Sequence, residues 1–106
     1  MEKQKFPKHY LASKKKFKEF FDALENLGSA TKQQGPLDER TTQLIQLAAA
    51  AAIHSEGAVH SHTRRAIAAG AKPEEIYHTV ILLTATIGFP TVAAALSWVD
   101  DVLGKK

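Results

Sequence analysis

The chain has 106 residues, a formal net charge of +3 and no cysteine. A chain of this length is expected to form one domain, residues 1–106, with a modest core. The missing cysteines exclude disulfides, thiolate nucleophiles and CxxC redox pairs. The longest apolar run, residues 47–53, is far too short to span a bilayer, and no apolar segment follows the first lysines as in a signal peptide. We therefore expect a cytoplasmic protein without membrane contacts.

Positive charge is concentrated near the N-terminus, where seven lysines and one glutamate fall within residues 1–18. Such a segment can contact nucleic acid or an acidic partner. No interleaved arginines and aromatic residues accompany the lysines, so a solvated helix face is the better interpretation and we expect no nucleic-acid partner. Residues 1–8 are polar and are expected to be flexible.

Helical periodicity covers most of the remaining chain, because apolar side chains recur every three or four residues. The expected helices cover residues 10–27, 39–54, 58–69, 73–87 and 92–103. Residues that typically start or end helices separate these stretches: Asp38, Pro73 and Thr91 at the starts, and Gly28 and Gly70 at the ends. No stretch alternates with period two for long enough to form a strand, so we predict an all-α bundle of about five helices.

The alanine-rich run LAAAAAI, residues 47–53, is apolar on every side of its helix. Such a helix is expected to be buried, so we place it at the centre of the bundle. Several helices are this apolar in a short chain, and a monomer would leave hydrophobic surface exposed. A homo-oligomer is the simplest way to bury that surface.

Candidate functional side chains gather in the segment HSEGAVHSH, residues 54–62. On a helix His62 shares a face with Arg65, and His60 shares a different face with Glu56 and Arg64. A histidine beside a guanidinium group offers an acid/base group next to an anion clamp.

Structural roles compete with this interpretation. On spacing alone His62 is equally well explained as a hydrogen-bonded interior residue. His54 fits the C-terminal end of the preceding helix, and His60 fits a solvated pair with Glu56. Arg64 and Arg65 diverge, and one of them is expected to pair with an acidic residue; the candidates are Glu74, Glu75 and Asp38.

The same segment contains the ligand types of a zinc, iron or manganese site: His54, Glu56, His60 and His62. The two members of an HxH pair on a helix lie roughly 200° apart and do not converge on one ion. We therefore expect no bound metal.

The stretch 37–89 resembles the carboxymuconolactone decarboxylase and alkylhydroperoxidase superfamily. LDERTTQLIQLAAAAA is similar to its first core helix, and the pattern HxxxAxxxGAxxEEI, from His62 to Ile76, is similar to its histidine helix and the turn that follows. The resemblance implies an all-α fold whose protomers associate as trimers or hexamers.

The resemblance also divides the possible chemistry. The peroxide-reducing branch uses a Glu, a CxxC pair and a His, and these positions correspond here to Gln43, Ser55, Ala58 and His62. Only the histidine remains, so we expect no peroxidase activity of the family type.

The decarboxylase branch needs neither cysteine nor a cofactor. The resemblance implies a lyase that converts a small carboxylated lactone, with His62 as the proton-transfer residue and Arg65 or Arg40 as the carboxylate clamp. Hydrogen bonds to the substrate are assigned to a set of three polar residues: Ser55, Gln43 and His60. The alternative is a non-catalytic, oligomeric binding or scaffold member of the same superfamily with a diverged pocket.

Overall fold

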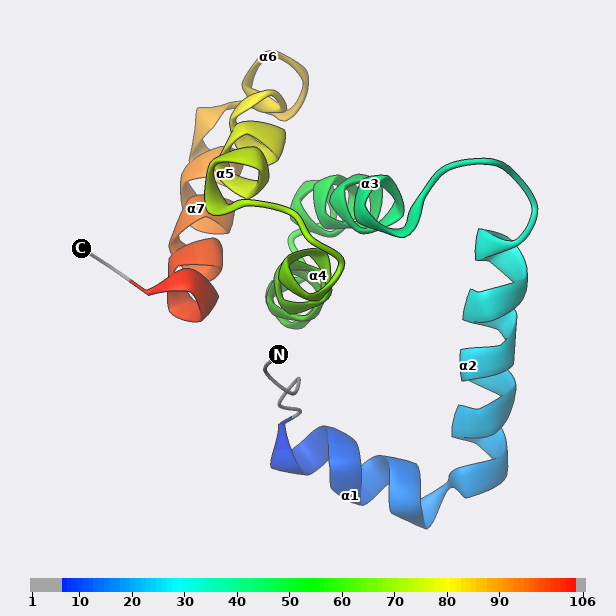
Figure 1. Ribbon diagram of the computed structural model, residues 1–106. Coiled ribbons are helices and arrows are strands. Elements are labelled where there is room, and N and C mark those ends of the chain that lie inside the picture. Colours follow the sequence, from blue (N-terminus) through cyan, green and yellow to red (C-terminus); the bar gives the residue numbers. More distant parts are fainter. Residues whose placement is uncertain (1–6, 105–106) are drawn as a thin grey trace. The chain divides into compact units, whose positions relative to one another are not determined.

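The computed structural model describes residues 7–104, and every regular element in that range is a helix (Figure 1). The helices are α1 Lys8–Lys16, α2 Lys18–Lys32, α3 Glu39–Ala52, α4 Glu56–Ala68, α5 Pro73–Ile81, α6 Thr84–Ile87 and α7 Phe89–Leu103. The all-α prediction is confirmed. The chain divides into two compact units, residues 1–37 and 38–106. The flexibility expected for residues 1–8 falls mostly outside the described part, which has Lys8 as the first residue of α1.

In the first unit the single helix expected for residues 10–27 is wrong in two respects. The backbone leaves helical geometry at Phe17, with φ −123° and ψ 57°, so α1 and α2 are separate. Helix α2 also continues through Gly28 to Lys32, and the Thr31 hydroxyl donates to the Gly28 carbonyl at 2.7 Å. Gly28 does not adopt the left-handed conformation of a helix-ending glycine, so the helix passes through it.

The second unit has a core of small and medium apolar side chains. Helix α3 packs against α4, α5 and α7, as its predicted central position requires. The expectation that the run 47–53 is buried on every side is wrong, because Ala49, Ala52 and Ile53 are exposed. Its alanines allow the neighbouring backbones to approach closely, and Leu47 is its largest fully buried side chain. The buried apolar residues are Leu47, Ala50, Ala51, Val59, Ala66, Ala71, Ile76, Val80, Val92, Ala95 and Val99.

Local chemistry fixes the starts of α3, α4 and α5. Asp38 caps α3, because its carboxylate accepts a hydrogen bond from the Thr41 backbone N–H at 2.8 Å. Helix α4 begins two residues earlier than predicted, since Ser55 is its N-cap and Gly57 lies within its first turn. Pro73 opens α5 as predicted, and the Glu75 side chain accepts the Lys72 backbone N–H at 2.9 Å.

The two predicted helices that follow differ from the structure near their ends. The stretch 73–87 is interrupted between α5 and α6, and next to this break the Thr84 hydroxyl donates to the Ile81 carbonyl at 2.7 Å. Helix α7 starts at Phe89 rather than after a Thr91 cap. Gly88, with φ 90°, makes the turn, and Pro90 fits the first turn without losing a hydrogen bond.

Helix α7 is held to α5 and α4 by polar contacts as well as by the core. The Tyr77 hydroxyl donates to Asp100 Oδ1 at 2.5 Å, and this hydrogen bond, together with burial, raises the pKa of Tyr77.

Several large apolar side chains remain more than half exposed on the second unit: Ile45, Ile53, Ile81, Leu82 and Phe89. Within residues 7–104, no helix has the length and apolar character needed to cross a bilayer.

Replacing Ile76 by alanine tests the packing of α5 on the core. Ile76 is fully buried, so Ile76→Ala should lower the free energy of unfolding by about 2–5 kcal/mol through lost burial and a residual cavity. The control His78→Ala changes an exposed residue of the same helix and should cost less than about 0.5 kcal/mol. Urea unfolding measures both values, and equal losses in the two variants would contradict the assigned orientation of α5.

The Asp38 cap predicts a pH-dependent contribution to stability. The hydrogen bond from the Thr41 N–H lowers the pKa of Asp38 from its usual value. The stabilisation is therefore fully present above the unfolded pKa of about 3.9 and is lost as pH falls through the lower folded pKa. The stability difference between the wild type and Asp38→Ala should be constant near neutral pH and should shrink below about pH 4.

Chemical unfolding at a series of pH values measures this difference. Asp38→Asn is the matched control, because asparagine caps a helix well but does not titrate. A difference between the wild type and Asp38→Ala that persists unchanged at the lowest pH of the folded state would contradict the assignment.

Candidate functional site

The candidate site is built on a hydrogen-bonded chain that joins α3 to α4. His62 Nδ1 lies 2.8 Å from Gln43 Oε1, and Gln43 Nε2 donates to Glu39 Oε2 at 2.8 Å. Gln43 is fully buried, His62 is half-buried and Glu39 is exposed. The chain therefore runs from the protein surface, through a buried amide, to the imidazole.

The order of donors and acceptors in this chain defines the tautomer of His62. An ionised Glu39 carboxylate only accepts hydrogen bonds, so Gln43 presents its NH₂ group to Glu39 and its carbonyl oxygen to His62. His62 Nδ1 must then carry a hydrogen, and in the neutral ring Nε2 carries the lone pair. Because an amide oxygen is not basic, the hydrogen stays on Nδ1 in this pair.

The arginines are arranged differently from the sequence-based expectation. Arg40 forms an ion pair with Glu75 at 3.0 Å between partly exposed side chains. Within residues 7–104 neither Arg64 nor Arg65 forms an ion pair, so the expected pairing of one of them with Glu74, Glu75 or Asp38 is wrong. Among the three expected partners, Glu75 pairs with Arg40, at the start of α3.

Arg65 lies in the last turn of α4, three residues after His62, and is half-buried. Burial, followed by the positive charge of Arg65, lowers the pKa of Arg64. At the other end of α4, the Ser55 hydroxyl accepts the Ala58 N–H at 3.4 Å as the helix cap. The Ser55 hydroxyl hydrogen can still be donated to another group.

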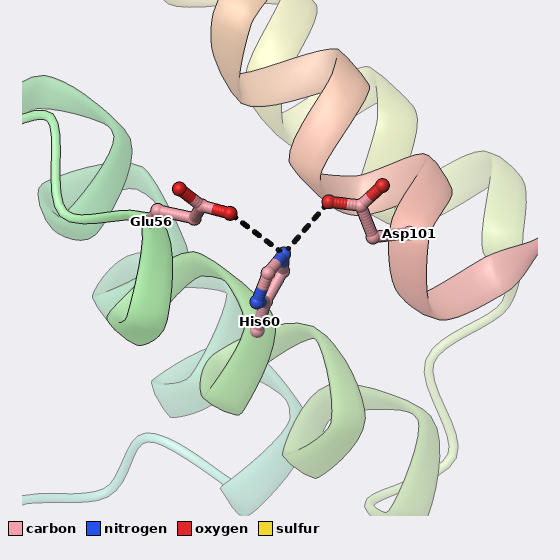
Figure 2. Close-up of side chains that lie close together, drawn as sticks. All are labelled: Glu56, His60 and Asp101. Carbon is pink, nitrogen blue, oxygen red and sulfur yellow. Dashed lines mark hydrogen bonds and ion pairs between the residues drawn. The ribbon is translucent and has the colours of Figure 1, made fainter. Parts of the chain in front are cut away.

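His60 belongs to a second cluster on another side of α4. Its Nε2 atom lies 3.0 Å from Asp101 Oδ2 on α7 and 4.0 Å from Glu56 Oε2 on α4 (Figure 2). The expected solvated pair of His60 with Glu56 is therefore the weaker of its two contacts. His60 and His62 diverge toward α7 and α3, so the structure does not bring His60 into the Gln43–His62 pair.

His54 links the end of α3 to the start of α7. Its Nε2 atom lies 3.2 Å from the Thr91 hydroxyl, and its backbone has φ 60°, which is uncommon for a residue other than glycine. His54 therefore lies in the turn after α3, where it bonds to a side chain of another helix.

Sequence reasoning missed two contributors to these clusters. Glu39 lies four residues before Gln43, and this helical spacing was a usable signal for their hydrogen bond. Asp101 lies 41 residues from its partner His60. No local pattern indicates this second contact, because it depends on how α7 packs against α4.

Comparison with known proteins agrees with this fold. The chain matches the model of the carboxymuconolactone decarboxylase family over residues 18–101. It is also similar to an uncharacterised protein of Methanocaldococcus jannaschii, with 31% identity over 91 residues that cover 86% of this chain and 85% of the relative. The family match includes α3, α4 and α5 in full, and with them Gln43 and His62. The chain belongs to the carboxymuconolactone decarboxylase family.

Proposed function

We propose that this protein is a cofactor-free carboxy-lyase that acts on a small carboxylated lactone, with His62 as the proton-transfer residue. The observation that carries the proposal is the hydrogen bond between His62 Nδ1 and the buried Gln43 amide. A catalytic imidazole needs a defined orientation and a defined tautomer, and this bond supports both.

The reaction requires little beyond positioning and one proton. When the carbon–carbon bond to the carboxylate breaks, carbon dioxide leaves and the bonding electrons pass into the unsaturated lactone. A proton must then be delivered to carbon, and the imidazolium form of His62 supplies it from Nε2. The Gln43 carbonyl accepts the Nδ1 hydrogen in both the neutral and the cationic ring, so the orientation holds throughout.

Arg65 is the better candidate for the carboxylate clamp. It shares a face of α4 with His62, and its guanidinium makes no ion pair within residues 7–104 that a substrate would have to displace. Arg40 would first have to release Glu75. We propose Ser55 as a hydrogen-bond donor to the substrate, whereas His60 is directed to Asp101.

A homo-oligomer forms part of the proposal. Side chains that are more than half exposed on α3, α5 and the following turn would be covered by a second copy. They include Ile45, Ile81 and Leu82.

One observation favours a second candidate, a non-catalytic oligomeric binding or scaffold member. Gln43 is fully buried and hydrogen-bonded at both ends of its amide, and a purely structural polar contact would have the same geometry. In that case the His62–Gln43 bond serves only to join α3 to α4.

An ultraviolet assay of 4-carboxymuconolactone loss distinguishes the two candidates. The wild type should be active, and His62→Gln should reduce kcat by about 10² to 10⁴-fold, the usual contribution of an acid/base group. Glutamine keeps a donor for Gln43 but cannot exchange the proton. The matched control is His78→Gln, which changes an exposed histidine of α5 and should leave kcat unchanged.

Circular dichroism and sedimentation velocity of the same samples verify that fold and oligomer are retained. An active His62→Gln variant would overturn the assigned role of His62. An inactive wild type would exclude this lactone as the substrate. If muconate-like dicarboxylates then leave the imidazole NMR signals unmoved, the scaffold function replaces the proposal.

A further inference from the structure

Three side chains that the proposed reaction does not use converge between α4 and α7. His60 and Glu56 lie one turn apart near the start of α4, and Asp101 lies near the end of α7 (Figure 2). One ligand atom from each of the three lies within 4.8 Å of the other two. The His60 imidazole points between the two carboxylates, and its side chain is 24% exposed, against 59% for Glu56 and 45% for Asp101.

Pairing among the three residues leaves negative charge uncompensated. His60 Nε2 can donate one hydrogen, and Asp101 receives it at 3.0 Å, whereas Glu56 at 4.0 Å lies beyond hydrogen-bond range. Two carboxylates held this close repel each other, and one imidazolium would neutralise only one of them.

The position of Asp101 adds a second unfavourable feature. It lies in the last turn of α7, where the exposed carbonyl groups of the helix disfavour a carboxylate, and that turn contains no basic residue. The neighbouring Asp100 is explained by the Tyr77 hydroxyl that bonds to it. Asp101 has His60 as its partner, and a cation at this point would offset both the helix dipole and the facing carboxylate.

We propose that Glu56, His60 and Asp101 bind a divalent first-row transition metal ion. One imidazole nitrogen and two carboxylate oxygens form a donor set suited to zinc, iron or manganese, and three protein ligands leave room for water. Donor atoms about 2.0–2.2 Å from an ion lie roughly 3.3 Å apart in a tetrahedral site. The His60–Asp101 separation of 3.0 Å is close to this value, and a side-chain rotation of the exposed Glu56, now 4.0 Å from His60, would complete the site.

The site fastens α4 to α7 and is separate from the candidate catalytic histidine. His60 and Asp101 lie 41 positions apart in the chain, so the bound ion would strengthen the polar contact that already joins α4 to α7. His62 points to Gln43 on α3, so loss of the metal and loss of the proposed lyase activity are distinct outcomes.

Calorimetric titration of the full chain with zinc chloride tests the proposal. We expect saturable binding of one ion per chain and a rise in Tm. His60→Gln and Asp101→Asn should each weaken binding by more than about tenfold, since even residues that only orient a ligand contribute roughly 10 to 100-fold. Two histidine controls, His78→Gln and His62→Gln, should bind zinc as the wild type does.

Cobalt(II) in place of zinc reports the ligands directly through its visible absorption, which should be lost in His60→Gln. Zinc binding that is unchanged in both His60→Gln and Asp101→Asn would overturn the proposal, as would the absence of saturable binding. Magnesium provides the chemical control. Magnesium prefers oxygen ligands, so magnesium binding as tight as zinc binding would mean that the carboxylates attract cations by charge alone, and this result would also overturn the proposal.

Discussion

The buried amide of Gln43 is the constraint on which the rest of the site depends. Its side chain is inaccessible to water, so both of its ends must find partners in the protein, and an unsatisfied end would cost about 1–3 kcal/mol. His62 satisfies the oxygen and Glu39 satisfies the nitrogen. The bond to His62 joins α4 to α3, and the bond to Glu39, within α3, orients the amide so that its oxygen faces the imidazole.

The small side chains of α3 make this arrangement possible. Alanines at the contact with α4 allow the two backbones to approach, and the same close packing fixes which histidine of α4 faces which neighbour. His62 meets Gln43 on α3, whereas His60 meets Asp101 on α7. Two histidines that are two residues apart thus enter different chemical environments, one suited to proton transfer and the other to a cation.

Much of the fold could be predicted from sequence because its signals are local. The Asp38 cap, Pro73 and the left-handed Gly70 each fix a helix end through the geometry of a few bonds, and all three were found. The mispredicted helix boundaries also depend on local features, but these features have weaker sequence signals. Helices that the apolar period alone would continue are interrupted at Phe17, where the backbone angles change, and just before Thr84.

The candidate site was less predictable than the fold. The resemblance aligned Gln43 with the glutamate position and His62 with the histidine position of a known family pattern, but it did not reveal that the two bond to each other. It also grouped His60 with the substrate-binding residues. The contact of His60 with Asp101 forms only when α7 packs on α4, so the local sequence could not show it. Contacts between residues far apart in the chain depend on tertiary packing, and one sequence contains no direct record of them.

The central claim is that Gln43 fixes the tautomer of His62, and NMR of the imidazole nitrogens tests it most directly. In isotope-labelled protein at a pH where the ring is neutral, long-range proton–nitrogen correlations distinguish a protonated from an unprotonated ring nitrogen. The account predicts a hydrogen on His62 Nδ1 and a lone pair on Nε2, with the preference lost in Gln43→Met, which preserves the side-chain volume but offers no amide. A wild-type His62 that carries its hydrogen on Nε2 would contradict the account.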